Sequence, residues 1–135
     1  MSGSLVGLKK LTKNDLSWLE PGSKSHQAGI NLPLRQFRDL FPGISDREGS
    51  PRVGLDVRWH DEDGDVFAYT RNDVVWYSSK RELRLLHVGR EGLFHMAEIG
   101  DLMVIERVEQ RLEVHVLPGK LEGELDIIGI GRWIR

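Results

Sequence analysis

The segment from Ser78 to Arg84 combines residue types that are suited to reading DNA bases. Lysine and arginine bind phosphates and donate hydrogen bonds to guanine, whereas a carboxylate repels the DNA backbone. Glu82 is therefore best explained as an acceptor for a cytosine amino group, with Arg84 donating to guanine beside it. A salt bridge from Glu82 to Arg84 or Lys80 is the simpler interpretation, and it is compatible with base contact. The segment predicts sequence-specific DNA recognition rather than catalysis.

The rest of the chain lacks the residue patterns of common catalytic and metal centres. There is no cysteine, which excludes disulfides, thiolate metal sites and a cysteine nucleophile. No Pro-Asp pair precedes an Asp/Glu-x-Lys triplet of the kind that holds magnesium in restriction nucleases. The acidic run Asp61–Asp65 reads as a solvated hairpin turn, since a calcium loop would need a downstream glutamate. Four histidines share no ligand spacing such as i, i+4: His60, His87, His95 and His115. We therefore expect no enzyme activity, no metal ion and no cofactor.

The net charge of −2 hides an uneven distribution along the chain. Residues 9–38 carry six basic and two acidic side chains, a charge of +4, and residues 71–90 carry five basic and two acidic ones, a charge of +3. Residues 91–127 carry three basic and nine acidic side chains, a charge of −6. Such polarity can steer a protein toward DNA despite its total charge, although uneven charge is also common on surfaces that bind no partner.

Apolar periodicity predicts the elements that must position these groups. The first part of the chain predicts, in order, a strand over Leu5–Thr12, a polar loop over Thr12–Gln27 and a short strand over Ala28–Leu32. Pro33 or Leu34 then begins a helix that runs through Phe41, with its apolar residues on one face, and Pro42–Gly43 ends it.

Hairpins dominate the remainder. Val53, Leu55, Val57 and Trp59 alternate with polar or small residues and predict a half-buried strand. After the turn at Asp61–Asp65, further strands are expected over Val66–Thr70, Val74–Tyr77, Leu83–Val88, Leu102–Val108, Leu112–Leu117 and Asp126–Ile134, with a second short helix around Leu93–Ile99.

This order predicts one mainly-β (α+β) domain over residues 1–135: an open, barrel-like sheet of seven or eight strands with one or two short helices. Trp59 and Trp133 lie in apolar patterns and are expected in the core, whereas Trp18 and Trp76 lie near the basic segments, where a tryptophan could stack on a base. No stretch reaches the roughly 18 apolar residues of a membrane span, and the first residues lack the features of a secretory signal. An intracellular protein without a membrane partner is expected.

Three blocks of sequence, in a fixed order, resemble one known family. They are Lys9–Asp15 (KKLTKND), His26–Pro33 (HQAGINLP) and Leu40–Ile44 (LFPGI), and the similarity continues at Asn72 and through Lys80–Arg84 to Gly89. Over about residues 8–90 the chain resembles the N-terminal effector-binding domain of EcoRII-like type II (IIE) restriction endonucleases. The resemblance implies the DNA-binding pseudobarrel fold, which plant auxin-response-type transcription factors share.

The resemblance further implies that two loops of a bacterial cytoplasmic protein grip the major groove and read CCWGG or a related short site, where W is A or T. The implied DNA-binding residues are Ser23, Lys24, Ser25, His26, Gln27 and Asn31 in the first loop, and Ser78, Ser79, Lys80, Arg81, Glu82 and Arg84 in the second. The implied phosphate contacts are Lys9, Lys10, Arg71 and Asn72. The chain departs from the family pattern at four positions: Ser78 and Leu83, where lysine is expected, Arg81, where asparagine is expected, and Asn31, where an aromatic is expected.

Three functions follow as expectations. The first is a non-catalytic, monomeric reader of double-stranded DNA that serves a nuclease domain in the same parent chain. The second is a regulatory β-barrel that binds a small ligand or a protein, which explains the apolar strands but gives the basic loops no role. The third is a compact nuclease with an unrecognised site.

Overall fold

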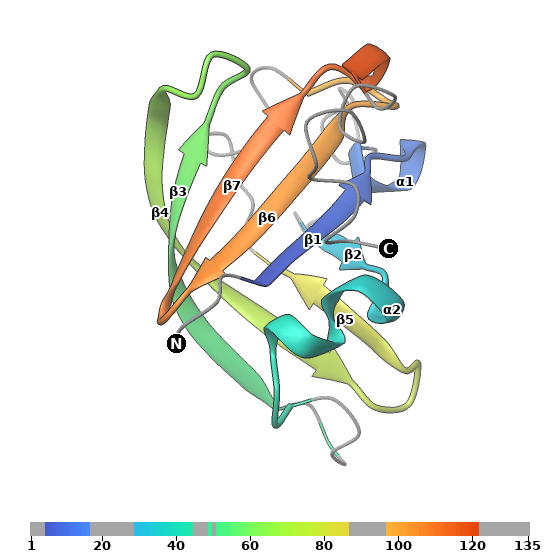
Figure 1. Ribbon diagram of the computed structural model, residues 1–135. Helices are drawn as coiled ribbons and strands as arrows, with labels where there is room; N and C mark the ends of the chain where they lie inside the picture. Colours follow the sequence, from blue (N-terminus) through green and yellow to red (C-terminus); the bar gives the residue numbers. More distant parts are fainter. Residues whose placement is uncertain (1–4, 17–28, 45–48, 50, 87–96, 122–135) are drawn as a thin grey trace, which may run out of the picture.

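Seven strands form one mixed sheet in the computed structural model of the chain (Figure 1). The structure describes residues 5–16, 29–44, 49, 51–86 and 97–121. The strands are β1 (Leu5–Lys10), β2 (Ile30–Leu32), β3 (Arg52–His60), β4 (Val66–Tyr77), β5 (Glu82–Leu85), β6 (Leu102–Val108) and β7 (Arg111–Leu117). The helical elements are α1 (Lys13–Leu16), α2 (Leu34–Phe37) and the 3-10 turns η2 (Arg38–Leu40) and η4 (Gly119–Leu121).

The sheet curls into a nearly closed barrel with the strand order β1-β6-β7-β3-β4-β5-β2. Neighbouring strands are antiparallel except β3 and β7, which run parallel between Asp56–His60 and Arg111–His115. Within the described part of the chain, the two end strands β1 and β2 do not pair with each other, so the barrel keeps a seam. The predicted fold class, a mainly-β open barrel of seven or eight strands, is therefore confirmed, and the described residues contribute seven strands.

The helix α2 contacts both β1 and β5 and so lies across the seam (Figure 1). Its Phe37 is fully buried and lies so close to Gly7 of β1 that a side chain at residue 7 would collide with the ring. The side-chain oxygen of Gln36 accepts a hydrogen bond from the Leu8 backbone N–H at 3.1 Å. This contact satisfies a donor on the edge of β1 that no other described strand pairs with.

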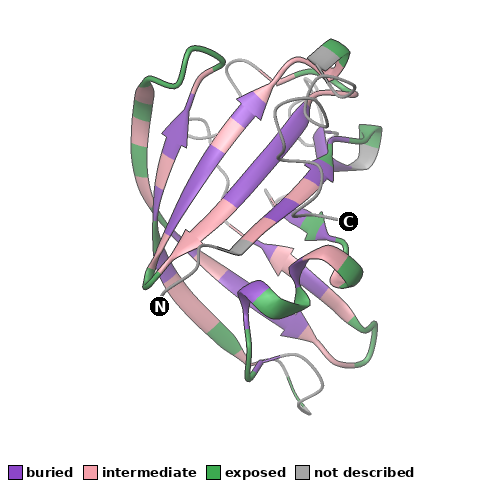
Figure 2. Ribbon diagram, viewed as in Figure 1, coloured by how far each residue is buried: buried purple, intermediate pink, exposed green. Residues whose placement is uncertain are grey.

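Large apolar side chains fill the barrel interior, as the purple segments of Figure 2 show. The alternation predicted for β3 is confirmed, because Leu55, Val57 and Trp59 are each at most 1% exposed. Fully burying a large apolar side chain contributes about 1.5–3 kcal/mol, so these residues are a main source of stability. Trp76 is 1% exposed as well. It belongs to the core and is not available to stack on a base.

The strand β4 differs from its prediction, because it runs without interruption from Val66 to Tyr77, where the sequence predicts two strands and a break. The polar residues of the expected break pair with β3, and Asn72 is only 1% exposed. The Thr70 hydroxyl donates to the Asn72 side-chain oxygen, and Asn72 Nδ2 donates to the Leu86 carbonyl oxygen at 2.9 Å. A buried polar side chain is tolerated when it is hydrogen-bonded in this way, so its polarity does not end the strand.

The helical predictions also need correction. Lys13–Leu16 form the short helix α1 inside the segment predicted to be a loop, and the helix from Leu34 tightens into a 3-10 turn at Arg38. Residues 97–100 contain a turn and no helix, while residues 93–96 and the strand predicted over Asp126–Ile134 lie outside the described residues. No helix among the described residues is long and apolar enough to cross a membrane.

Candidate nucleic-acid interface

The turn that joins β4 to β5 carries the basic residues that the sequence singles out. Ser78–Arg81 form this turn, and the Ser78 hydroxyl donates to the Gly49 carbonyl oxygen at 2.8 Å. Ser79, Lys80 and Arg81 are exposed. Arg81 has a positive φ of 52°, a conformation that costs a side-chain-bearing residue about 1–2 kcal/mol. Its guanidinium lies 5.9 Å from the centroid of the Trp76 ring, so a buried tryptophan supports the strained residue from below.

Glu82 and Arg84 lie side by side on the outer face of β5. The strand alternates, so Leu83 and Leu85 fill the core while the two charged side chains point outward, each about 30% exposed. Arg84 donates to Glu82 Oε2 through Nε at 3.1 Å and through Nη2 at 2.9 Å. The guanidinium also lies 5.7 Å from the centroid of the Tyr77 ring. The salt bridge that the sequence offers as the simpler interpretation is thus present, and it fixes both side chains in one orientation.

Asn31 is brought beside this pair by the sheet register. In β2 it lies directly opposite Arg84 of β5, so the two residues share the outer face although the sequence separates them widely. Asn31 is exposed, whereas Ile30 and Leu32 on either side are buried. The end of the first predicted loop and the second predicted loop therefore meet on adjacent strands. Ser23, Lys24, Ser25, His26 and Gln27, the other predicted residues of the first loop, lie outside the described residues.

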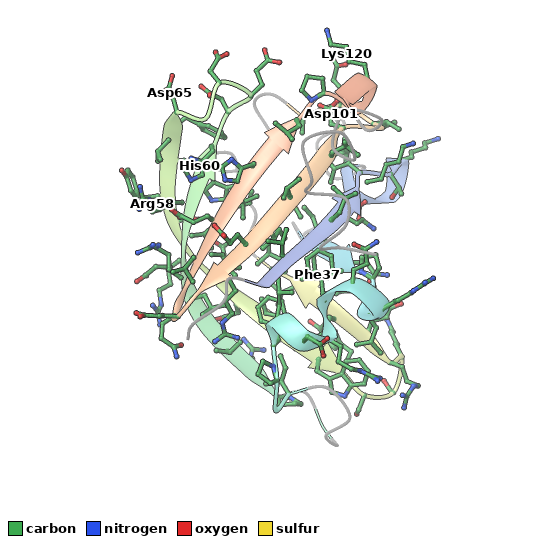
Figure 3. All side chains as sticks on the ribbon, viewed as in Figure 1. Phe37, Arg58, His60, Asp65, Asp101 and Lys120 are labelled. Carbon is green, nitrogen blue, oxygen red and sulfur yellow. The ribbon has the colours of Figure 1, made fainter. Side chains whose placement is uncertain are left out.

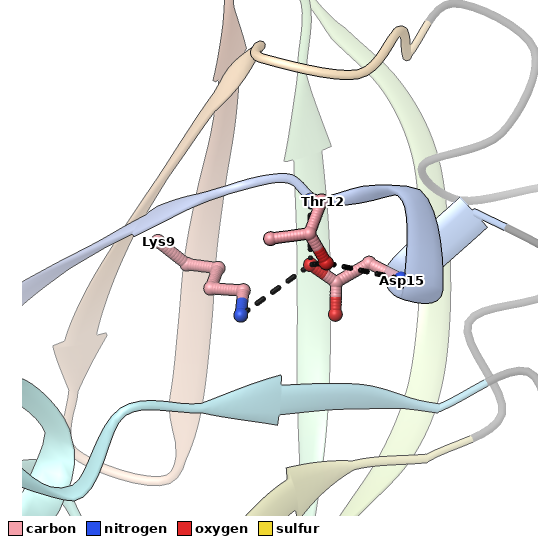
Figure 4. Close-up of polar contacts among 3 residues, drawn as sticks. All are labelled: Lys9, Thr12 and Asp15. Atoms are coloured by element: carbon pink, nitrogen blue, oxygen red, sulfur yellow. Dashed lines mark hydrogen bonds and ion pairs between the residues drawn. The ribbon is translucent and has the colours of Figure 1, made fainter.

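The segment that leads into the first loop is fixed by a capping box (Figure 4). Asp15 accepts hydrogen bonds from the Thr12 backbone N–H at 2.8 Å and from the Thr12 hydroxyl at 3.0 Å, and the Asp15 N–H donates back to that hydroxyl at 3.4 Å. Lys9 Nζ lies 3.3 Å from the same carboxylate oxygen, and both side chains are at most 10% exposed. This arrangement begins α1 and sets the direction in which the chain leaves β1.

The four predicted phosphate contacts occupy different environments. Lys10 is exposed on β1. Arg71 is exposed on β4 and pairs with Asp56 at 3.1 Å. Lys9 is buried against Asp15, and the hydrogen-bonded side chain of Asn72 is buried in the barrel. The geometry gives Lys9 and Asn72 structural roles and does not support a phosphate contact by either, whereas Lys10 and Arg71 can reach a ligand.

A polar cluster on β3 and β7 is missing from the sequence predictions. Glu113 is 9% exposed and lies under two arginines: its Oε1 is 3.2 Å from Arg58 Nη1, and its Oε2 is 3.5 Å from Arg111 Nε. His60 Nε2 lies 3.6 Å from Glu113 Oε1, and the His60 and His115 rings stack with centroids 4.2 Å apart. Figure 3 labels Arg58 and His60 on this side of the barrel. Period-two alternation in each strand is visible in the sequence, but the parallel pairing of β3 with β7 that assembles the cluster is not.

The environment of the cluster shifts the titration of one histidine. Burial holds the pKa of His115 below its ordinary value of 6.5, and the neighbouring His60 lowers it further. Glu106 and Glu113 act in the opposite direction and only partly offset the burial. His115 is therefore favoured as the neutral ring at neutral pH. Within the described residues, no group of three histidine or acidic side chains is arranged to hold a metal ion.

Neither known protein families nor curated proteins provide a match for this chain.

Proposed function

We propose that this chain is a sequence-specific reader of double-stranded DNA, the recognition domain of an EcoRII-like restriction system, and that it reads CCWGG or a related short site in the major groove. The observation that carries the proposal is the Glu82–Arg84 pair, which is held on the outer face of β5 beside Asn31 and next to an exposed basic turn. In this role the chain is a monomer without catalytic activity, and a nuclease domain in the same parent chain would do the cleavage. The proposed subcellular location of the protein is the bacterial cytoplasm.

The pair supports the proposal because it presents a donor and an acceptor together. Both hydrogen bonds between the side chains use Glu82 Oε2, and no hydrogen bond among the described residues uses Glu82 Oε1 or Arg84 Nη1. One side of the pair can thus accept from a cytosine amino group while the other donates to guanine. Because the ion pair and the Tyr77 ring already restrict both side chains, binding would cost little side-chain entropy.

The surroundings of the pair suit backbone contacts. Lys80 and Arg81 extend from the turn just before Glu82 and are exposed. Cations at such positions bind phosphates, which fixes the register of a protein on the duplex without reading its sequence. The positive φ of Arg81 also supports a functional turn, since strained residues with side chains cluster at binding sites.

The alternative of a ligand-binding barrel is less well supported. Trp59, Trp76, Phe37 and Phe41 are each at most 1% exposed and occupy the interior that such a ligand would need. A barrel that encloses a ligand needs an interior cavity for it, and among the described residues these aromatic side chains occupy that position.

Fluorescence anisotropy of a labelled CCWGG duplex tests the proposal, with a scrambled duplex as the control and each titration repeated at low and at moderate salt. We expect tight binding to CCWGG and weak, strongly salt-dependent binding to the scrambled sequence. Equal, salt-sensitive binding to both duplexes would retain DNA binding but reject the site, and a selection from random sequences would then identify the true one. The absence of binding to either duplex would reject the function.

A further inference from the structure

A second cluster of cationic and aromatic side chains lies on the outer face of β3, β4 and β7, far from the turn at Ser78–Arg81. It forms a shallow hollow whose lining includes Arg58, Tyr69, Arg71, Arg111 and Asp56, here called the arginine–tyrosine hollow. On β4, Arg71 of the hollow and Val75, which lies opposite Arg84, are four residues apart, which corresponds to about 13 Å along a strand. The hollow is therefore separate from the Glu82–Arg84 pair, although it includes Arg71, one of the predicted phosphate contacts. The inference below does not rest on the proposed function, and Tyr69 distinguishes the two because it belongs to the hollow alone.

The sheet register arranges the hollow as two rows. In the first row Asp56 of β3 lies between Arg71 of β4 and Arg111 of β7. In the second row Arg58 of β3 lies opposite Tyr69 of β4. With strands about 4.8 Å apart, the backbones at Arg71 and Arg111 are about 10 Å apart, and Asp56 lies between them. Three guanidinium groups and a phenol ring therefore converge on one face.

The arginines of the hollow are positioned by two acids, Glu113 and Asp56. Glu113 lies on the same outer face, covered by Arg58 and Arg111 and only 9% exposed, and those arginine side chains remain 37% and 43% exposed. Asp56 pairs with Arg71 at 3.1 Å, with both side chains about two-thirds exposed or more. Glu106 of β6 lies opposite Glu113 and adds a third acid beside the three arginines. The exposed Asp56–Arg71 pair is weak enough to be opened by a competing anion, which would free the Arg71 guanidinium.

Tyr69 is the unusual member, because its side chain is 72% exposed in the middle of a strand. Phe67, two residues earlier on the same strand, is 36% exposed. An aromatic ring that faces solvent between arginines is the arrangement with which proteins stack unpaired bases while cations hold the phosphates. A DNA duplex offers phosphates but keeps its bases stacked inside, so it would leave the Tyr69 ring without a partner.

We propose that the arginine–tyrosine hollow binds single-stranded nucleic acid, with a base stacked on Tyr69 and the backbone held by Arg58, Arg71 and Arg111. Binding of this kind is tolerant of sequence, because every base has a face that can stack, and it weakens as salt is raised.

The test is fluorescence anisotropy of a labelled oligothymidylate of about ten nucleotides, a length within the usual range for one binding domain. Tyr69→Ser and Arg71→Gln should each weaken binding about five- to hundredfold, and Tyr69→Phe should bind like the wild type, because it keeps the ring. The matched charge control is Arg35→Gln on α2, which is exposed and lies on another side of the barrel. It should change the affinity by about twofold or less, because a distant charge is screened.

The outcome also separates this inference from the proposed function. Tyr69→Ser should leave recognition of the CCWGG duplex unchanged, and far-ultraviolet circular dichroism should show the same fold as the wild type. The inference is overturned if the wild type does not bind the single strand, or if Arg35→Gln weakens binding as much as Arg71→Gln does. It is also overturned if Tyr69→Phe loses as much affinity as Tyr69→Ser.

Discussion

Truncation of Arg84 to alanine separates the contribution of this side chain to folding from the contribution to DNA reading that we propose for it. Within the protein, Arg84 makes an ion pair with Glu82 in which both side chains are about 30% exposed, and it lies over the Tyr77 ring. An ion pair of this exposure contributes at most about 1 kcal/mol, and an exposed cation–π contact contributes about 0.5–1 kcal/mol. The expected loss of stability, about 0.5–2 kcal/mol, leaves a domain of ordinary stability folded.

The expected loss of recognition is larger and depends on the DNA sequence. A bidentate contact between arginine and guanine discriminates by about 1–3 kcal/mol, or about 5- to 150-fold in affinity. Arg84→Ala should therefore bind CCWGG weaker by this factor, while its affinity for a scrambled duplex falls only by the loss of one charge. Arg84→Lys keeps the charge but not the planar fork, so it should lose specific affinity and retain affinity for the scrambled duplex.

Anisotropy titrations with both duplexes measure these losses, and urea unfolding followed by tryptophan fluorescence measures stability. Lys80→Ala serves as the matched control, since a phosphate contact should weaken both duplexes about equally. Equal losses on both duplexes for Arg84→Ala would remove Arg84 from the base-reading residues. Full specific affinity in Arg84→Lys would show that only the charge matters, which would contradict the argument from geometry.

Three further predictions concern the frame that holds the site. Gly7→Ala places a Cβ 2.5 Å from Phe37 Cε1, so urea unfolding should show a loss of about 1–3 kcal/mol; an unchanged midpoint would contradict this packing. The pKa of His115 is lowered in the folded protein, so the unfolded state binds more protons below about pH 6.5 and stability should fall as the pH drops through that window. The decline should be shallower in His115→Gln, and identical slopes in the two proteins would refute the linkage. Asp15→Ala leaves Lys9 buried without its counter-ion and should lower the free energy of unfolding by about 3 kcal/mol in the same assay. Lys9→Met should cost less, because it removes the cation itself. A larger loss in Lys9→Met than in Asp15→Ala would contradict the assignment of Asp15 as the centre of the capping box.

The elements that local patterns specify could be predicted from the sequence. Alternation at Leu55, Val57 and Trp59 predicts β3, and the acidic turn before Val66 predicts the hairpin that follows, because each signal lies within a few neighbouring residues. The short helix α1 also has a local signal, the capping-box spacing from Thr12 to Asp15, which a polar, proline-containing neighbourhood obscures.

What depends on distant pairing could not be predicted. Asn72 is polar and reads as a break in β4, but the Leu86 carbonyl and the Thr70 hydroxyl satisfy it inside the barrel. The parallel contact between β3 and β7 joins Arg58 to Glu113 across a long sequence separation, and the sequence of neither strand indicates that the two strands pair. The common face of Glu82 and Arg84 follows from alternation alone, whereas the position of Asn31 beside them depends on the register of β2 against β5.

The length of β4 relates the two surfaces. Its first half pairs only with β3 among the described strands and presents Tyr69 and Arg71, while its last residues pair with β5 and end at the basic turn. At the transition, hydrogen bonds link the Trp59 indole to Thr70, Thr70 to Asn72, and Asn72 to the Leu86 backbone. Because this series of hydrogen bonds lies inside the barrel, it fixes the residue at which β4 stops pairing with β3 alone and begins to pair with β5. The distance between the arginine–tyrosine hollow and the Glu82–Arg84 pair is then a fixed property of the fold, so a single nucleic acid could occupy both only if it spanned that length along β4.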